Sequence, residues 1–323
     1  MGKDKSVFNG LPLSDTSCAI IVTRSLPTNS SHLIRYLSGI EANWIIIVIN
    51  DDESDQRIEL QDKFTYLFTG DNLGGAGGFA YGIRYAIDNF KPDWIWTSDD
   101  DALPETLDIL RILISQAKIK NLDVCAPIIV TPENSEFLSF PYRLKLRRTW
   151  NRDLVVLSDF IDNQAHLFNG TLFNAAIFAK IGVPNMKLFI RGDEIEFLLR
   201  AKKHDCNIAT YTKAFMVHPS GANELQNALG PFLRISIPQD PIKLAYQIRN
   251  RGYIVIRYLQ FHWMIIDLFR FFCFAIVRKK PSGKILANLL ILYFIGILGM
   301  LDKPLLDYGN LLLKTIGSKK SEH

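Results

Sequence analysis

The chain has few cysteines, and their spacing excludes two classes of cross-linked protein. Only 4 of the 323 residues are cysteine, at positions 18, 125, 206 and 273. None forms a Cys-x-x-Cys pair or has the spacing to other Cys or His residues that zinc sites use. We therefore expect neither a disulfide framework nor a zinc site, and we expect a reducing compartment.

Long apolar runs are also scarce, and none lies near the N-terminus. MGKDKSVFNG (1–10) contains no apolar stretch, so we expect neither a secretion signal nor an N-terminal anchor. The longest run without charge, 285–301, is shorter than the roughly 20 apolar residues of a membrane-spanning helix. Helices that lie in the membrane interface or pack on a partner are favoured over spanning helices. An ordinary buried helical domain is the alternative.

The net charge is only +4, but it is unevenly distributed. Residues 241–323 hold 13 of the 37 lysines and arginines and 4 of the 33 acidic residues. Because these basic residues punctuate apolar runs, the composition is typical of a segment on an anionic membrane surface and not of a nucleic-acid-binding segment. We expect a first domain over residues 1–240 and a basic, apolar helical region for membrane or partner association over 241–323.

Strand and helix signals alternate over the first 130 residues. Short apolar runs end in polar turns and are separated by amphipathic helices, which predicts an α/β fold with a mostly parallel central sheet flanked by helices. Residues 131–165 are harder to assign, and LKLRRTWNRD (144–153) is a basic loop or a hairpin. The expected strands are 18–23, 44–50, 65–69, 93–98 and 125–130, and the expected helices are 33–40, 77–90 and 105–118.

Polar or glycine-rich residues follow three of the expected strands. Asn50 and Asp51 follow the second strand, DNLGGAGG (71–78) follows the third, and SDDD (98–101) follows the fourth. Ligands of parallel sheets collect at the carboxyl ends of the strands. We therefore expect these three segments to form one site.

The glycine-rich segment is suited to a phosphate or a sugar. Glycine lets the backbone approach a ligand closely, and the free amides at a helix start attract anions. An alternative interpretation takes Gly75-x-Gly77-x-x-Ala80 as the fingerprint of an NAD-dependent oxidoreductase. It is disfavoured because that fingerprint expects one acidic residue at the end of the next strand, where three aspartates stand.

The three aspartates indicate a divalent cation. Adjacent carboxylates repel one another unless a cation binds them, and Mg²⁺ or Mn²⁺ takes one or two carboxylates together with substrate phosphates. In an extended segment Asp99 and Asp101 would face one site while Asp100 pointed elsewhere. The alternative is that an aspartate caps the next helix, which requires one aspartate and not three.

Taken together, these motifs resemble inverting glycosyltransferases of family 2, and within them the bacterial galactofuranosyltransferase-like group, over residues 17–260. This resemblance implies a GT-A fold, which is Rossmann-like, with a C-terminal helical membrane-associating region. The segments that resemble the family's motifs are IIVINDDESD (45–54), NLGGAGGF (72–79), SDDDALP (98–104), FNGTLF (168–173), FIRGDEIEFLLRA (189–201), VHPSG (217–221) and AYQIRN (245–250).

The resemblance also implies roles for individual residues. Asp99, Asp101 and His218 would hold Mn²⁺ or Mg²⁺, although a lone histidine is more often structural than a ligand. The acid pair Asp193 and Glu194 would provide the catalytic base. The nucleotide-sugar donor would be bound by Asn50, Asp51, Asn72, Gly74, Gly75, Asp99 and Asp100.

The acidic motif departs from the family pattern. Relatives usually have Asp-Asp preceded by Trp, and this chain has Gly192-Asp193-Glu194. Asp193-x-x-Glu196 has the spacing of a helix capping box, and Glu196 and Arg200 have that of an i, i+4 ion pair. A purely structural interpretation thus explains Asp193, Glu196 and Arg200. It does not explain Glu194, which we therefore favour over Asp193 as the base.

The implied activity is that of a metal-dependent inverting enzyme that moves galactofuranose from UDP-galactofuranose to a hydroxyl of a lipid-linked cell-envelope glycan, such as O-antigen. A dTDP-rhamnose donor is the alternative within the class, and a catalytically inactive nucleotide-binding membrane scaffold is the alternative outside it. The implied location is peripheral, at the cytoplasmic face of the bacterial inner membrane. No nucleic-acid partner is expected, and a homo-oligomer is left open.

Overall fold

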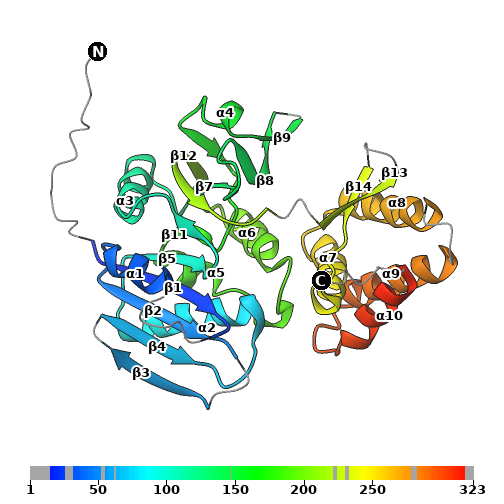
Figure 1. Cartoon of the computed structure of the whole chain (residues 1–323), viewed down its shortest axis with the longest axis horizontal. Coiled ribbons are helices and arrows are strands. Elements are labelled where there is room, and N and C mark those ends of the chain that lie inside the picture. Colours follow the sequence, from blue (N-terminus) through cyan, green and yellow to red (C-terminus); the bar gives the residue numbers. More distant parts are fainter. Residues whose placement is uncertain are drawn as a thin grey trace.

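The computed structural model describes residues 15–25, 32–51, 55–61, 63–145, 147–220, 224–229, 233–277 and 282–316. Figure 1 shows a sheet with helices on its two sides, and next to it a group of C-terminal helices. The strands are β1 (Ser17–Thr23), β2 (Trp44–Ile49), β3 (Arg57–Gln61), β4 (Phe64–Phe68), β5 (Trp94–Asp99), β6 (Leu103–Pro104), β7 (Val124–Val130), β8 (Phe137–Leu144), β9 (Arg147–Asn151), β10 (Phe160–Asp162), β11 (Asn169–Asn174), β12 (Ile208–Val217), β13 (Leu225–Leu229) and β14 (Leu233–Ser236). The helices are α1 (His32–Gly39), α2 (Gly74–Asn89), α3 (Ile109–Lys120), α4 (Arg152–Val155), α5 (Ala176–Ile181), the 3₁₀ turn η1 (Met186–Leu188), α6 (Asp193–Lys203), α7 (Pro241–Arg257), α8 (Phe261–Val277), α9 (Ser282–Ile297) and α10 (Leu306–Ile316).

The sheet has the order β10-β12-β7-β11-β5-β1-β2-β4-β3, with β6, β8 and β9 attached beside it. Its central strands β5, β1, β2 and β4 are parallel, as the sequence predicts. Strand β11 lies antiparallel between β5 and β7, and β12 runs parallel to β7. The carboxyl ends of β5, β1, β2 and β4 therefore lie at one edge, where the polar segments were expected to meet.

The two faces of the sheet are covered by different helices, which makes the fold Rossmann-like. Alternate residues of β1 point to opposite faces, so that Ile21 packs with α1 and α3 and Ile20 packs with α2, α5 and α6. Both residues are almost fully buried. The four cysteines are buried and free. This packing explains why β1, β2 and β5 read as continuous apolar runs.

The structure also departs from the expected elements in places. LKLRRTWNRD forms the second half of a hairpin, because β8 and β9 pair antiparallel. Strand β3 was not predicted; it is short, and all of its side chains are exposed, including those of Ile58 and Leu60. Helix α2 begins at Gly74, within the glycines, and α3 begins only at Ile109. RKKPSGK (278–284) was expected to form a basic turn; its residues 278–281 lie outside the described residues, as do Asp52 and the chain before residue 15, and α9 begins at Ser282.

Helices α7 to α10 form a bundle with its own apolar core, to which the hairpin β13–β14 also contributes. Helices α7 and α9 cross at close range at two glycines. A Cβ atom at Gly252 would lie 2.0 Å from the carbonyl oxygen of Tyr293, and one at Gly296 would lie 1.8 Å from that of Arg249. Among the described residues, no helix has both the length and the apolar character needed to cross a membrane.

Candidate active site

Asn50 connects the end of β2 to the glycine-rich segment. Its side-chain oxygen accepts a hydrogen bond from the amide of Leu73 (2.9 Å), and its side-chain nitrogen donates to the carbonyl of Gly74 (2.8 Å). The residue is buried, and both ends of its amide group are used inside the protein. Asn50 therefore positions the glycine-rich segment, while the next residue, Asp51, is half-buried at the same strand end.

The amides at the start of α2 are largely occupied by the protein itself. The amide of Gly74 donates to the Asn72 side chain (3.1 Å), and the amide of Ala76 donates to the carbonyl of Phe189 (3.0 Å). Gly74 has φ +67°, and a Cβ there would lie 2.1 Å from the Phe189 oxygen. The expectation that these particular amides receive a phosphate is not supported, because they already have acceptors.

The other glycines of the segment differ in what surrounds them. A Cβ at Gly77 would meet Leu73 at 2.4 Å, and one at Gly78 would meet Val22 at 2.6 Å, so these glycines let α2 lie close to its own start and to β1. At Gly75 a Cβ would meet nothing within 4 Å. Gly75 is therefore the predicted donor-binding glycine that faces open space.

The three aspartates do not lie in one extended segment. Strand β5 ends at Asp99, and Asp100 and Asp101 form a turn closed by a hydrogen bond from the Ala102 amide to the Asp99 carbonyl (3.3 Å). The Asp100 carboxylate accepts a hydrogen bond from the Thr23 hydroxyl at the end of β1 (2.6 Å). The turn, and not strand alternation, thus separates the three side chains.

Asp101 and His218 meet, as the resemblance implied. The Asp101 Oδ1 atom lies 3.3 Å from His218 Nε2, with the aspartate side chain 56% exposed and the histidine 16%. The hydrogen bond from His218 lowers the pKa of Asp101. Burial lowers the pKa of His218, but the hydrogen bond to Asp101 and the charge of Asp101 outweigh it, so the net shift is upward.

Asp99 does not complete a three-residue metal site. Among the described residues, no three His, Cys, Asp or Glu side chains converge as cation ligands. Asp99 nevertheless belongs to the same acidic group: burial raises its pKa to about 7, and the charges of Asp101, Asp100 and Glu194 act in the same direction. Each of these carboxylates therefore disfavours ionisation of Asp99, and a bound cation would relieve that repulsion.

The acid pair lies at the start of α6, beside this group. Asp193 is buried, and burial together with the charge of Glu194 and a hydrogen bond between the two side chains raises its pKa well above the usual range. Glu194 is half-buried, and its Oε2 atom also accepts a hydrogen bond from the Gly192 amide (2.9 Å). Asp193 is thus the buried acid of the pair, whose ionisation its surroundings oppose, and Glu194 is the more accessible of the two carboxyl groups.

One prediction for this motif is confirmed and two are wrong. Arg200 and Glu196 form the expected ion pair, at 2.9 Å. The capping box is absent, because Gly192 occupies the cap position and Asp193 is already helical. Glu194 was expected to have no local partner, but it has Gly192 and Asp193.

Sequence reasoning missed how the acid pair is held in place. The acid-motif loop, residues 185–192, contains Phe189 and Arg191 with positive φ, a conformation unfavourable for both. The Asn250 side chain on α7 donates to the carbonyls of Leu188 (2.8 Å) and Arg191 (2.6 Å), and the neighbouring Arg249 donates to the carbonyl of Lys187 (3.1 Å). The sequence feature that could have indicated this support is the AYQIRN motif, because its Arg249 and Asn250 are fully buried.

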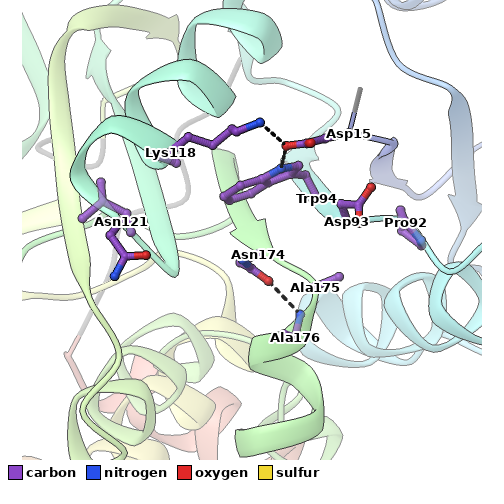
Figure 2. A pocket seen from close by; sticks show the side chains of 11 residues that line it. Asp15, Pro92, Asp93, Trp94, Lys118, Asn121, Asn174, Ala175 and Ala176 are labelled. Atoms are coloured by element: carbon purple, nitrogen blue, oxygen red, sulfur yellow. Dashed lines mark hydrogen bonds and ion pairs between the residues drawn. The ribbon is translucent and has the colours of Figure 1, made fainter. Parts of the chain in front are cut away.

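A hollow of about 500 Å³ lies far from these residues along the strands. Figure 2 shows that it is lined by Asp93 and Trp94 at the beginning of β5, together with Lys118 and Asn174. Its polar groups already bind one another: Asp15 pairs with Lys118 (2.9 Å) and accepts a hydrogen bond from the Trp94 indole (3.0 Å). The second aspartate of this hollow, Asp93, accepts hydrogen bonds from Thr16, so both of its acids have partners within the protein and it is not the candidate site.

The chain was compared with known proteins. The model of glycosyl transferase family 2 matches residues 31–180. The galactofuranosyltransferase GlfT1 of Mycolicibacterium smegmatis is 33% identical over 255 residues, covering 75% of this chain and 83% of the relative. GlfT1 of Mycobacterium tuberculosis (strain CDC 1551 / Oshkosh) is 31% identical over 288 residues, covering 84% and 92%.

A solved structure, GalNAc-T7 with UDP, GalNAc and Mn²⁺, is similar at a TM-score of 0.49 and 12% identity, covering 74% of this chain and 48% of that one. The sequence relatives establish the family. The parallel strands β5-β1-β2-β4, with helices on both faces of the sheet, establish the fold class. The chain belongs to glycosyltransferase family 2, among its galactofuranosyltransferase-like members, and it is a glycosyltransferase with a Rossmann-like fold.

Proposed function

We propose that this enzyme transfers galactofuranose from UDP-galactofuranose to a hydroxyl of a lipid-linked cell-envelope glycan, such as O-antigen, with inversion and with the help of a divalent cation. The observation that carries the proposal is the acidic group itself. Asp101, His218, Asp100 and Glu194 all lie within electrostatic reach of Asp99 at the carboxyl edge of the sheet. The two relatives named galactofuranosyltransferase support the choice of sugar.

Glu194 would act as the base. Its carboxylate removes the proton from the acceptor hydroxyl while that oxygen attacks the anomeric carbon from the face opposite the nucleotide. Asp193, which holds its own proton, donates a hydrogen bond to Glu194 and keeps the carboxylate oriented. The Gly192 amide donates to Oε2 of the same carboxylate and also holds it in place.

Asp101 and His218 would hold Mn²⁺ or Mg²⁺. An oxygen and a nitrogen ligand 3.3 Å apart suit such a cation, and two protein ligands are sufficient where diphosphate oxygens provide others. When bound, the cation disperses the charge of the departing diphosphate. We assign donor contacts to Asp51, Gly75 and Asp100, with Asn50, Asn72 and Gly74 supporting the segment that carries Gly75.

The donor assignment can be tested by release of nucleotide. The assay contains purified protein, Mn²⁺ and an acceptor-containing membrane extract. UDP is expected to be released from UDP-galactofuranose at least about tenfold faster than from UDP-galactopyranose. The reason is that an enzyme distinguishes two donor sugars by how well it binds their transition states. The Glu194→Gln variant is the control for contaminating hydrolases. Faster release of dTDP from dTDP-rhamnose would establish the alternative donor, and UDP binding without release from any donor would indicate an inactive scaffold.

We further propose that residues 241–323 attach the protein to the cytoplasmic face of the inner membrane. Helix α8 carries an exposed apolar stripe at helical spacing, which includes Ile265, Phe269 and Phe272. This region is not a removable tail, because α7 shares its core with α9 and also holds the acid-motif loop. Point variants are therefore a better test than truncation.

The variant Ile265→Asp/Phe269→Asp/Phe272→Asp is expected to bind vesicles of phosphatidylcholine and phosphatidylglycerol at least about tenfold more weakly than the unaltered protein. Each buried large apolar side chain contributes about 1.5–3 kcal/mol, and 1.4 kcal/mol corresponds to a factor of ten. Leu157→Asp, at an exposed apolar position outside the bundle, is the control. Unchanged sedimentation of the triple variant would refute membrane attachment through α8.

A further inference from the structure

Arg191, two positions before the acid pair, lies in an unfavourable backbone conformation. Its φ is +65°, in the left-handed region that residues with a Cβ atom disfavour, and the following Gly192 also has positive φ, at +92°. Strained residues of this kind persist only where their surroundings hold them. The contacts of Arg191 therefore decide the conformation of the acid-motif loop where it enters α6.

The peptide unit between Arg191 and Gly192 is held at both of its ends. Its carbonyl, that of Arg191, accepts a hydrogen bond from the Asn250 side chain on α7 (2.6 Å). Its N–H, that of Gly192, donates to Glu194 Oε2 (2.9 Å). Because a trans peptide unit is planar, its carbonyl and its N–H point in opposite directions. One orientation of this unit thus satisfies both partners, and a rotation of it would break both hydrogen bonds.

The side chain of Arg191 reaches the C-terminal region by a different route. Its Nη2 atom donates to Oε1 of Glu224, the residue before β13 (2.5 Å). The Ser236 hydroxyl on β14 donates to the other carboxylate oxygen of Glu224 (3.2 Å). The Gln247 side chain on α7 in turn donates to the carbonyl of Ser236 (2.8 Å). Both oxygens of Glu224 are therefore engaged, and the contacts that hold the ion pair end on α7.

Burial distinguishes this ion pair from another one that joins the same loop to the C-terminal region. The side chains of Arg191 and Glu224 are 32% and 24% exposed. Those of Lys187 and Asp302, which lie 2.9 Å apart, are 59% and 76% exposed. Water and salt weaken an ion pair between exposed side chains, so that it contributes little to stability. Of these two pairs, Arg191 and Glu224 are the one suited to restrain the loop.

We propose that Arg191 is a positioning residue for the catalytic base and that Glu224 holds it in place. The ion pair keeps Arg191 in its left-handed conformation, and this keeps the next peptide unit oriented with its N–H toward Glu194. That hydrogen bond fixes the direction in which the Glu194 carboxylate meets the acceptor hydroxyl. Arg191 thus acts through Glu194 and not by touching a substrate. The inference rests on the proposed function, in which Glu194 is the base.

The first test measures the loop without any substrate, by hydrogen–deuterium exchange of the full chain. Glu224→Ala is expected to raise the exchange rate of the Gly192 amide at least about tenfold, because loss of the ion pair eases local opening of the loop. Lys187→Gln is the matched control. It removes the exposed ion pair of the same loop and should change this rate by less than about twofold. Equal exchange in Glu224→Ala and the unaltered protein would overturn the proposal.

The second test is steady-state kinetics with varied donor. Arg191→Met and Glu224→Ala should each lower kcat at least about tenfold and change the KM for the donor by less than about twofold, because a misdirected base affects the transition state and not donor binding. The double variant should lose no more than the larger of the two single losses, since the two side chains act as one unit. Arg191→Lys keeps the charge-assisted hydrogen bond, and its kcat should stay within about threefold of the unaltered value.

The remaining outcomes separate a positioning role from the other roles of this ion pair. Loss of kcat in Arg191→Met without a loss in Glu224→Ala would mean that Arg191 binds a substrate directly, which overturns the proposal. Faster amide exchange with unchanged kcat in both variants would mean that the ion pair only stabilises the loop, which refutes it as well. If the unaltered enzyme turned over no nucleotide sugar, the proposed function would fail, and amide exchange would still decide whether Glu224 holds the loop.

Discussion

Replacing Glu194 with glutamine is expected to lower kcat for transfer by roughly 100- to 10,000-fold, the usual contribution of a positioned general base. Glutamine keeps the size of the side chain and its hydrogen bond with the Gly192 amide, but it cannot accept the acceptor's proton. The KM for UDP-galactofuranose should change by less than about twofold, since the loss is confined to the transition state. Steady-state kinetics with varied donor measures both parameters.

The companion variant Asp193→Asn distinguishes the two acids. Asp193 is buried, and burial raises its pKa, so the surroundings of this side chain favour a neutral group such as asparagine. Its kcat should fall by less than about tenfold, as expected for a residue that orients the base and does not remove the proton. If Asp193→Asn instead caused the larger loss and Glu194→Gln the smaller one, the base would be Asp193.

Replacing Asp101 with asparagine is expected to lower kcat/KM at least about 100-fold. A Lewis-acid cation contributes several kcal/mol to the transition state, and about 1.4 kcal/mol corresponds to a factor of ten in rate. Asparagine is a weaker ligand than a carboxylate, and it also removes the ionic partner of His218. Saturating Mn²⁺ should restore part of the activity, so the measurement is a Mn²⁺ titration of the initial rate.

Asp100→Asn is the matched variant for this titration. It removes one charge from the same turn, but its carboxylate faces Thr23 and not His218. The half-saturating Mn²⁺ concentration should therefore stay within about threefold for Asp100→Asn and rise by more than about tenfold for Asp101→Asn. Full activity of the unaltered enzyme in EDTA would contradict the metal assignment as a whole.

The arrangement of the acid-motif loop links these predictions to the rest of the chain. The loop touches α2 through the Phe189 carbonyl and α7 through Asn250. Arg249 extends the connection, because its side chain also donates to the carbonyl of Leu301, between α9 and α10. The C-terminal helices therefore support the position of the acid pair directly, and they are more than a membrane attachment added to a complete enzyme.

The patterns that local chemistry dictates were visible in the amino-acid order. Continuous apolar runs predicted the buried strands β1, β2 and β5, and the polar residues after them marked the edge where the acids gather, because parallel strands end together. The pair Glu196 and Arg200 was predictable from helical spacing alone. The family and the acid pair followed from motifs with a fixed local spacing.

Other features depended on contacts between distant parts of the chain. Gly74 was expected to face a phosphate, yet it faces the carbonyl of Phe189, which is more than one hundred residues away in sequence. Asn50 was expected to bind the donor, and it is used to hold the glycine-rich segment. Periodicity reports the immediate neighbours along a helix or strand and cannot report which carbonyl from another segment arrives at the same place.

The sequence by itself determined the fold class, the strand ends that carry the chemistry and the family to which the enzyme belongs. Only the tertiary structure decided which glycine faces open space, which acid of the pair is buried and which carbonyls hold the acid-motif loop. The physical reason is that burial, backbone hydrogen bonding and charge repulsion depend on the distances between side chains, and long-range packing of the sheet against the C-terminal helices sets those distances.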